Sequence, residues 1–144
     1  MANKRSIPWR NRSPVGWWIA SYIQRFEWKD SPPKTSRSRC LAWENTILIK
    51  AKDRESAHRK AIMYGKRSAN GRWALLGEAP GRLGRWVFEG ITSLLPIYEP
   101  LEDGSEVLWN EHASMTVGSL HRRVKSKLCL ESFQDQFSRG MLRS

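Results

Sequence analysis

The fold is decided by residues 85–110, which read Arg-Trp-Val-Phe-Glu-Gly-Ile-Thr-Ser-Leu-Leu-Pro-Ile-Tyr-Glu-Pro-Leu-Glu-Asp-Gly-Ser-Glu-Val-Leu-Trp-Asn. Apolar residues occupy both alternating parities, with Trp86, Phe88 and Leu94 on one and Val87, Ile91 and Leu95 on the other. This pattern is typical of a central strand that is covered on both faces. Two prolines then predict a bend. Asp103-Gly104 predicts a tight turn and a short returning strand, because Gly accepts the positive φ of such turns.

Length and composition indicate one globular domain. The chain has 144 residues, enough for a sizeable core, and 40% of them are hydrophobic. Eight tryptophans are spread along it. Each indole buries about 150–250 Å², so packing in a core or a dimer interface explains them. The alternative is a set of base-stacking platforms.

The positive charge is concentrated at the two ends of the chain. The net charge is +11, and residues 1–40 hold nine Lys/Arg against two acids. Residues 41–118 hold ten of each kind, and residues 119–144 hold six Lys/Arg against two acids. We therefore expect attraction to nucleic acid or to an acidic partner to come from the termini. The alternative is that basic ends only keep the protein soluble.

The compartment is predicted from cysteines and targeting signals. Cys40 and Cys129 show no metal-ligand spacing, so they are two reduced thiols of a cytosolic protein or one long-range disulfide. No apolar run reaches the ~20 residues of a membrane helix. Val15–Ile23 follows basic residues as in a signal peptide, but Gly16 and Ser21 interrupt it and no convincing cleavage site follows. The sequence therefore predicts a cytoplasmic protein.

The first half of the chain predicts two strands and one helix. Gly16–Trp28 alternates as a strand, with Trp18, Ala20, Tyr22, Phe26 and Trp28 on one face, interrupted by Gln24. Lys29–Arg39 is a loop and Leu41–Ala51 a second strand. Asp53 is the expected N-cap of a helix that runs from Arg54 to about Tyr64, with an apolar stripe of alanines. Gly65 is the expected C′ glycine that ends it.

The remaining segments complete the predicted organisation. Trp73–Leu76 is a short strand or a turn of helix, and Val117–Leu130 has the spacing of an amphipathic basic helix. A second short amphipathic piece is expected at Glu131–Phe137. The predicted fold is α+β, an antiparallel sheet of about four strands with one main helix packed on it and a C-terminal amphipathic helix. We divide it into a basic flexible or loosely docked arm, 1–15, a core domain, 16–112, and a basic helical extension, 113–144.

Three ordered blocks carry a resemblance to a known family. They are Trp18-x-Ala20, the run Leu48-Ile49-x-Ala51-x-Asp53-x-x-x-Ala57-x-x-x-Ala61-x-x-x-Gly65, and Trp86-x-Phe88-x-Gly90 followed by Leu101-x-Asp103-Gly104-x-Glu106-Val107. In this order the chain resembles a small bacterial family known as domain of unknown function 4288, over roughly residues 16–110. The resemblance implies a compact α+β domain and no established activity. The arm, the Pro/Ser loop and the segment after residue 112 depart from its pattern.

The chemistry-bearing side chains predict no catalytic, metal or cofactor site. The three histidines are not in metal-binding spacing, and no glycine-rich phosphate loop is present. The turn is rich in acids, and we interpret them as solvated side chains. Alternatively, two of them form a pair for acid/base catalysis. These acids are Glu99, Glu102, Asp103, Glu106 and Glu111. Glu111 and His112 would act as a general base and the residue that orients it only if a nucleophile lies near them.

The basic residues are the candidate binding site. They are Arg5, Arg10, Arg12, Arg37, Arg39, Arg122, Arg123, Lys125 and Lys127. If the fold brings them together, they form a face for phosphate or for an acidic surface. We therefore expect a non-enzymatic protein-binding module, inhibitor-like or an accessory subunit, with an acidic protein partner and itself a homodimer or a subunit of a complex. The alternatives are a nucleic-acid-binding accessory protein acting through its basic termini, and an enzyme using the acidic hairpin.

Overall fold

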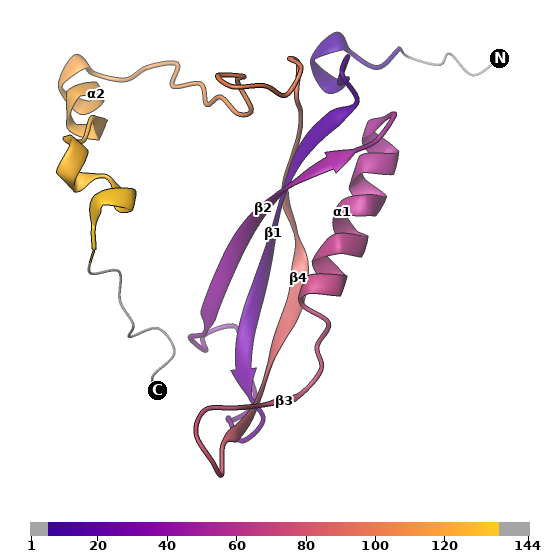
Figure 1. The fold of residues 1–144 in the computed structure, drawn as a ribbon, viewed down its shortest axis with the longest axis vertical. Coiled ribbons are helices and arrows are strands. Elements are labelled where there is room, and N and C mark those ends of the chain that lie inside the picture. The colour runs from indigo at the N-terminus through magenta and orange to yellow at the C-terminus, as the bar shows by residue number, and fades with distance from the viewer. Residues whose placement is uncertain (1–5, 136–144) are drawn as a thin grey trace. The chain divides into compact units, whose positions relative to one another are not determined.

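A four-stranded antiparallel sheet with one long helix packed on it forms the body of the protein (Figure 1). The computed structural model describes residues 6–135. The strands and α-helices are β1 (Trp17–Trp28), β2 (Leu41–Lys50), α1 (Arg54–Ser68), β3 (Ala74–Leu76), β4 (Arg82–Pro96) and α2 (Val117–Arg123), and a 3-10 turn, Trp9–Asn11, precedes β1. The strands lie in the order β2-β1-β4-β3. The α+β prediction is therefore confirmed.

The chain divides into two compact units, Met1–Trp109 and Asn110–Ser144. The first unit contains the sheet and α1, and the second contains α2 and two short 3-10 turns, Lys127–Cys129 and Glu131–Phe133.

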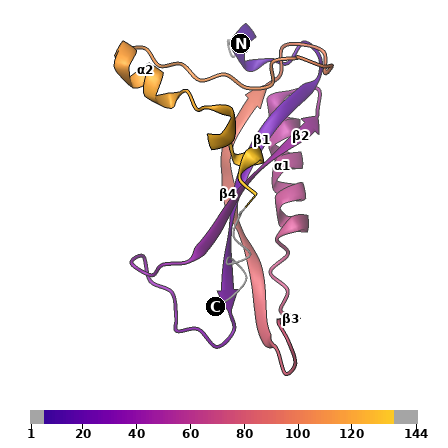
Figure 2. The same ribbon diagram turned by 60° about the vertical axis from the view of Figure 1, so that its left-hand side comes forward.

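The core lies between β1, β2 and α1, on the sheet face predicted from the alternation of the first strand. Trp18 and Ala20 of β1, Ile49 of β2, and Ala57 and Ala61 of α1 form one buried cluster. The two alanines are fully buried, which lets α1 approach the strands closely. Figure 2 shows α1 beside the half of the sheet nearer the N-terminal arm, with the strands extending beyond its last turn.

The start of α1 was predicted correctly and its end was not. Asp53 is the N-cap, and its carboxylate Oδ1 accepts from the Ser56 amide at 2.8 Å. The helix continues through Gly65 to Ser68 and ends at the C-cap Ala69. Gly65 is a buried helical residue and not a C′ residue, and a Cβ atom there would lie 2.3 Å from the Phe88 ring of β4. Close approach, and not a left-handed turn, explains this glycine.

Within the first unit, helix coverage of β4 is one-sided, which corrects the prediction of a strand covered on both faces. β4 pairs with β1 along most of its length, and β3 pairs with its first residues. The face toward α1 holds Ile91 and Leu94, which pack on the core. On the opposite face Leu95 of β4 is 40% exposed and Leu48 of β2 is 50% exposed. Apolar residues at both odd and even positions of β4 therefore do not mean that both faces of the strand are covered.

The Asp103-Gly104 turn is confirmed, but the returning strand is wrong. Gly104 has φ +85°, and the Ser105 amide donates to the Glu102 carbonyl at 3.0 Å. Residues 105–110 then form no strand. Pro96 and Pro100 lack amide donors, so the outgoing segment offers no continuous ladder for a partner strand. The fourth strand is instead β3, one of the two alternatives predicted for Trp73–Leu76.

The C-terminal helix is shorter than the predicted Val117–Leu130. α2 begins after the cap Thr116, whose Oγ1 accepts from the Ser119 amide at 3.1 Å, and it ends at Arg123. Val124 is extended, and separated 3-10 turns follow. Helices below about 12–15 residues are marginal without tertiary packing, and the side chains of α2 are not buried. The predicted piece Glu131–Phe137 is a 3-10 turn, Glu131–Phe133, and its last two residues lie outside the described range.

Two further features concern the cysteines and the helices. Cys40 and Cys129 are both exposed free thiols, as in the reduced alternative. Within residues 6–135, none of the helices has the length and apolar character needed to cross a membrane.

Candidate functional site

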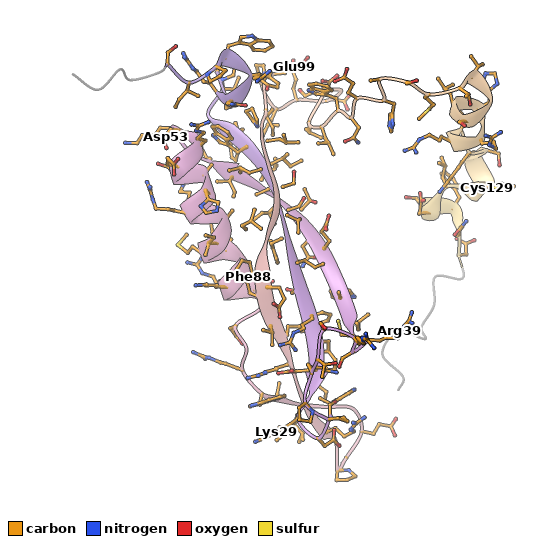
Figure 3. The ribbon with its side chains drawn as sticks, turned by 180° about the vertical axis from the view of Figure 1, so that it is seen from behind. Lys29, Arg39, Asp53, Phe88, Glu99 and Cys129 are labelled. Carbon is orange, nitrogen blue, oxygen red and sulfur yellow. The ribbon has the colours of Figure 1, made fainter. Side chains whose placement is uncertain are left out.

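The predicted basic residues do not form one face on the first unit. Arg10 and Arg12 precede β1, whereas Arg37 and Arg39 lie in the loop after β1. The 12-residue length of β1 corresponds to about 40 Å between these ends. Figure 3 shows Arg39 near Lys29 at one end of the sheet and Asp53 and Glu99 at the other. Arg5 lies outside the described residues.

The four remaining basic residues lie in the second unit. Arg122 and Arg123 close α2, and Lys125 and Lys127 follow it. All four are exposed. Lys125 binds Glu131 at 2.7 Å, which raises the pKa of Lys125, mainly through the hydrogen bond to that carboxylate. The predicted set is therefore split between two ends of one unit and a separate unit.

Apolar side chains accompany these cations on the second unit. Val117 and Leu120 of α2 are 69% and 50% exposed. The following segment exposes Val124 (72%), Leu128 (75%), Leu130 (40%) and Phe133 (46%). We call these six residues the C-terminal apolar set. The sequence showed the amphipathic spacing of this segment but not that its apolar side chains would remain uncovered.

The N-terminal arm is held against the end of β4. The Ser13 hydroxyl donates to the Ile97 carbonyl at 2.8 Å, and the Tyr98 hydroxyl donates to the Arg10 carbonyl. The Trp9 and Tyr98 rings pack with centroids 5.9 Å apart. These contacts hold the polar arm beside the residues that directly follow β4.

A cleft of about 500 Å³ lies between the arm, the start of α1 and Tyr98. Its lining includes buried Trp18, whose indole donates to the Ala51 carbonyl at 3.0 Å. Its charged residues are Arg12, Lys52, Asp53 and Arg54. The hydrogen bond from the Ser56 amide is the main cause of the lowered pKa of Asp53. Four separate segments build the cleft, so no local sequence pattern predicted it.

At the other end of the sheet, cations are paired with acids and stacked on indoles. The Arg82 guanidinium lies 4.2 Å from the Trp28 ring centroid and binds Asp30 at 2.7 Å. The Arg85 guanidinium lies 4.1 Å from the Trp73 ring centroid and binds the Glu27 carboxylate at 2.5 Å. These ion pairs reduce the charge that this end offers to a polyanion.

The acidic turn shows no buried carboxylate pair within the described residues. The Glu99 carboxylate accepts from the Glu106 amide at 3.2 Å, and the Glu102 amide donates to the Ser105 hydroxyl at 2.9 Å. The acids of the turn and His112 are exposed. Over residues 6–135, no group of three His, Cys, Asp or Glu side chains is placed to hold a metal ion.

The described residues form a small α+β fold with exposed apolar and basic side chains. The chain belongs to the family of the domain of unknown function DUF4288, whose family model matches residues 17–109. This match covers the sheet, α1 and the Asp103-Gly104 turn, so the resemblance of the three sequence blocks is confirmed. No curated protein and no solved structure matches the chain.

Proposed function

We propose that the protein is a non-enzymatic protein-binding module, an inhibitor-like or accessory subunit, that binds an acidic protein through its second unit. The observation that carries this proposal is the C-terminal apolar set, six apolar side chains that are each at least 40% exposed. Exposed apolar side chains gathered along one segment of the chain favour contact with a partner, because their contact with water is unfavourable.

The cations that accompany this set favour an acidic partner. Arg122 and Arg123 lie between Leu120 and Val124 in sequence, and Lys127 precedes Leu128. An apolar groove with an acidic rim would cover the apolar side chains and pair the cations around them. The cations would also accelerate association with an acidic surface. A contact with nucleic acid that depends on charge, and not on the base sequence, does not need so many apolar side chains.

The short length of α2 is consistent with a segment that becomes more ordered when it binds a partner. An amphipathic helix laid in a groove is a common peptide-recognition mode. Contact with a partner would supply the packing that α2 lacks, and the turns at 127–133 could then join a longer helix. In this proposal the protein works in the cytoplasm, consistent with its two exposed free thiols.

The test is capture of partners from nuclease-treated lysate of the source cell, read by mass spectrometry. We expect the full chain to retain a protein partner. Leu120→Ser/Leu128→Ser should lose that partner, and Arg122→Glu/Arg123→Glu should weaken its retention. Gln134→Ala, also exposed in the second unit, is the matched control and should behave as wild type.

Three results would count against the proposal. Recovery of nucleic acid alone from lysate that has not been treated with nuclease, steeply weakened by salt, would support the nucleic-acid alternative. Retention of the same partner by both double variants would place the contact elsewhere. An activity of the purified protein that Glu106→Ala and Glu111→Ala abolish, with folding intact, would support the enzyme alternative.

A further inference from the structure

The outer edge of β2 is long, regular and exposed. β2 pairs with β1 over ten residue pairs without a bulge, whereas the β1–β4 ladder has two irregularities. β2 is the first strand in the sheet order, so within the described residues no strand pairs with its other side. It contains no proline, and β-branched or apolar residues occupy its centre at 46–49. Proteins usually blunt such an edge, because its unpaired main-chain groups invite another strand.

The hydrogen bonds at the end of β2 show which residues face outward. The Ala51 amide donates to the Gly16 carbonyl at 2.9 Å, on the β1 side. Alternate residues of an antiparallel strand direct both main-chain groups to the same side. The even-numbered residues Ala42, Glu44, Thr46, Leu48 and Lys50 therefore direct their amides and carbonyls outward, and all five are exposed.

The Lys50 carbonyl confirms this assignment and marks the end of the edge. It accepts from Lys60 Nζ of α1 at 2.6 Å, so it is not directed at β1. The same residues share one side-chain face, because the Thr46 hydroxyl lies 2.8 Å from the Ser21 hydroxyl on β1, opposite the face that α1 covers. Glu44 and Lys50 thus present opposite charges on one face of one edge.

We propose that this edge pairs with the same edge of a second copy of the chain, antiparallel, about a two-fold axis through Ile47. This register sets Glu44 of each copy opposite Lys50 of the other and Thr46 opposite Leu48. The four outward-facing pairs would exchange about six main-chain hydrogen bonds, because the Lys50 carbonyl of each copy already accepts from Lys60. Two cross-strand ion pairs accompany them, related by the symmetry that makes such an interface self-complementary.

The side chains on the other face of β2, the face that α1 covers, favour the same two-fold axis. Ile47 is only partly buried and packs on the edge of the core beneath α1. At the axis it would meet its own copy in a non-hydrogen-bonded pair, where facing side chains are closest. Moving the axis to Thr46 sets Glu44 opposite Leu48 and removes both ion pairs. The charges therefore select one register and one occupant.

The first test removes an outward donor without touching the β1 ladder. Thr46→Pro deletes an amide that faces away from β1, a position where an edge strand tolerates proline. Wild type should be a dimer in sedimentation equilibrium across a dilution series, and Thr46→Pro a folded monomer. A monomeric wild type, or a folded Thr46→Pro that stays dimeric, would overturn the proposal.

The second test examines the proposed strand register and does not require a proline substitution. Glu44→Lys and Lys50→Glu each place like charges opposite each other twice, so each should weaken its own dimer about tenfold. Mixing the two variants restores opposite charges at both positions and should recover a heterodimer as tight as wild type. The double variant Glu44→Lys/Lys50→Glu should also dimerise as wild type. Failure of mixing to restore the dimer would overturn this register.

Discussion

A methyl group added at Gly65 of α1 would lie 2.3 Å from the Cε2 atom of Phe88 on β4. Figure 3 shows Phe88 on β4 beside the last turns of α1. Phe88 also packs on Tyr22, with ring centroids 6.0 Å apart, so the ring is held from the β1 side as well. The contact between Gly65 and Phe88 therefore fixes how closely the helix can lie on the sheet.

We expect Gly65→Ala to destabilise the protein. Alanine in a helix interior is ordinarily better than glycine by about 1 kcal/mol, but overpacking costs about 1–3 kcal/mol. The free energy of unfolding, measured by urea denaturation, should fall by about 1 kcal/mol. In a Phe88→Leu background the same change should become neutral or stabilising. A stabilising Gly65→Ala in the wild-type background would contradict this packing.

Gln24 is a polar residue on the core face of β1, between Trp43 and Phe88 in the strand register. It is 4% exposed, and within the described residues its Oε1 atom has no hydrogen-bond partner. A buried unpaired acceptor costs about 1–3 kcal/mol, so Gln24→Leu should raise the free energy of unfolding by about 1 kcal/mol. Thermal and urea denaturation check this. A clear loss of stability would show that Gln24 is satisfied in solution.

Glu27 bridges two arginines on the face of the sheet opposite α1. Its carboxylate lies 2.6 Å from Arg25 and 2.5 Å from Arg85, and its side chain is 13% exposed. The hydrogen bond from Arg25 is the main cause of its lowered pKa. Because the folded pKa lies below the unfolded value of about 4.3, this stabilisation is complete well above that value and is lost as pH falls through the folded pKa.

Glu27→Gln should therefore lower the free energy of unfolding at pH 7 by about 1–2 kcal/mol. The difference between variant and wild type should shrink as the pH falls below the unfolded value of about 4.3 and through the lower folded pKa of Glu27. Urea denaturation over a pH series checks both statements. Asp30→Asn is the control, because the exposed Asp30–Arg82 pair is screened by solvent and its loss should change stability less. A difference that is constant with pH would contradict the ion-pair explanation.

The parts of the fold that local chemistry determines could be predicted from the sequence. Alternation placed Trp18 and Ala20 on the core face, and the position of Asp53 before an alanine stripe gave the helix start. The end of α1 could not be predicted, because a glycine required by a neighbouring ring looks the same in sequence as a C′ glycine. Only the tertiary contact with Phe88 distinguishes the two cases.

The candidate surfaces were less predictable than the fold. The basic residues were visible, but their division between the two ends of β1 depends on strand length and topology. The cleft lined by Arg12, Trp18 and Tyr98 joins segments far apart in the chain. The exposed edge of β2 follows from the strand order, which no local pattern specifies.

The most direct test of the proposed function is site-specific photo-cross-linking of the full chain in source-cell lysate. A cross-linking amino acid replaces Leu128 of the C-terminal apolar set, 75% exposed, or, as a control, Met63 on the outer side of α1, 44% exposed. We predict that the Leu128 position yields one protein adduct that withstands nuclease and that the Met63 position does not. A nucleic-acid adduct alone at Leu128, the same adducts at both positions, or no adduct at Leu128 would contradict the account.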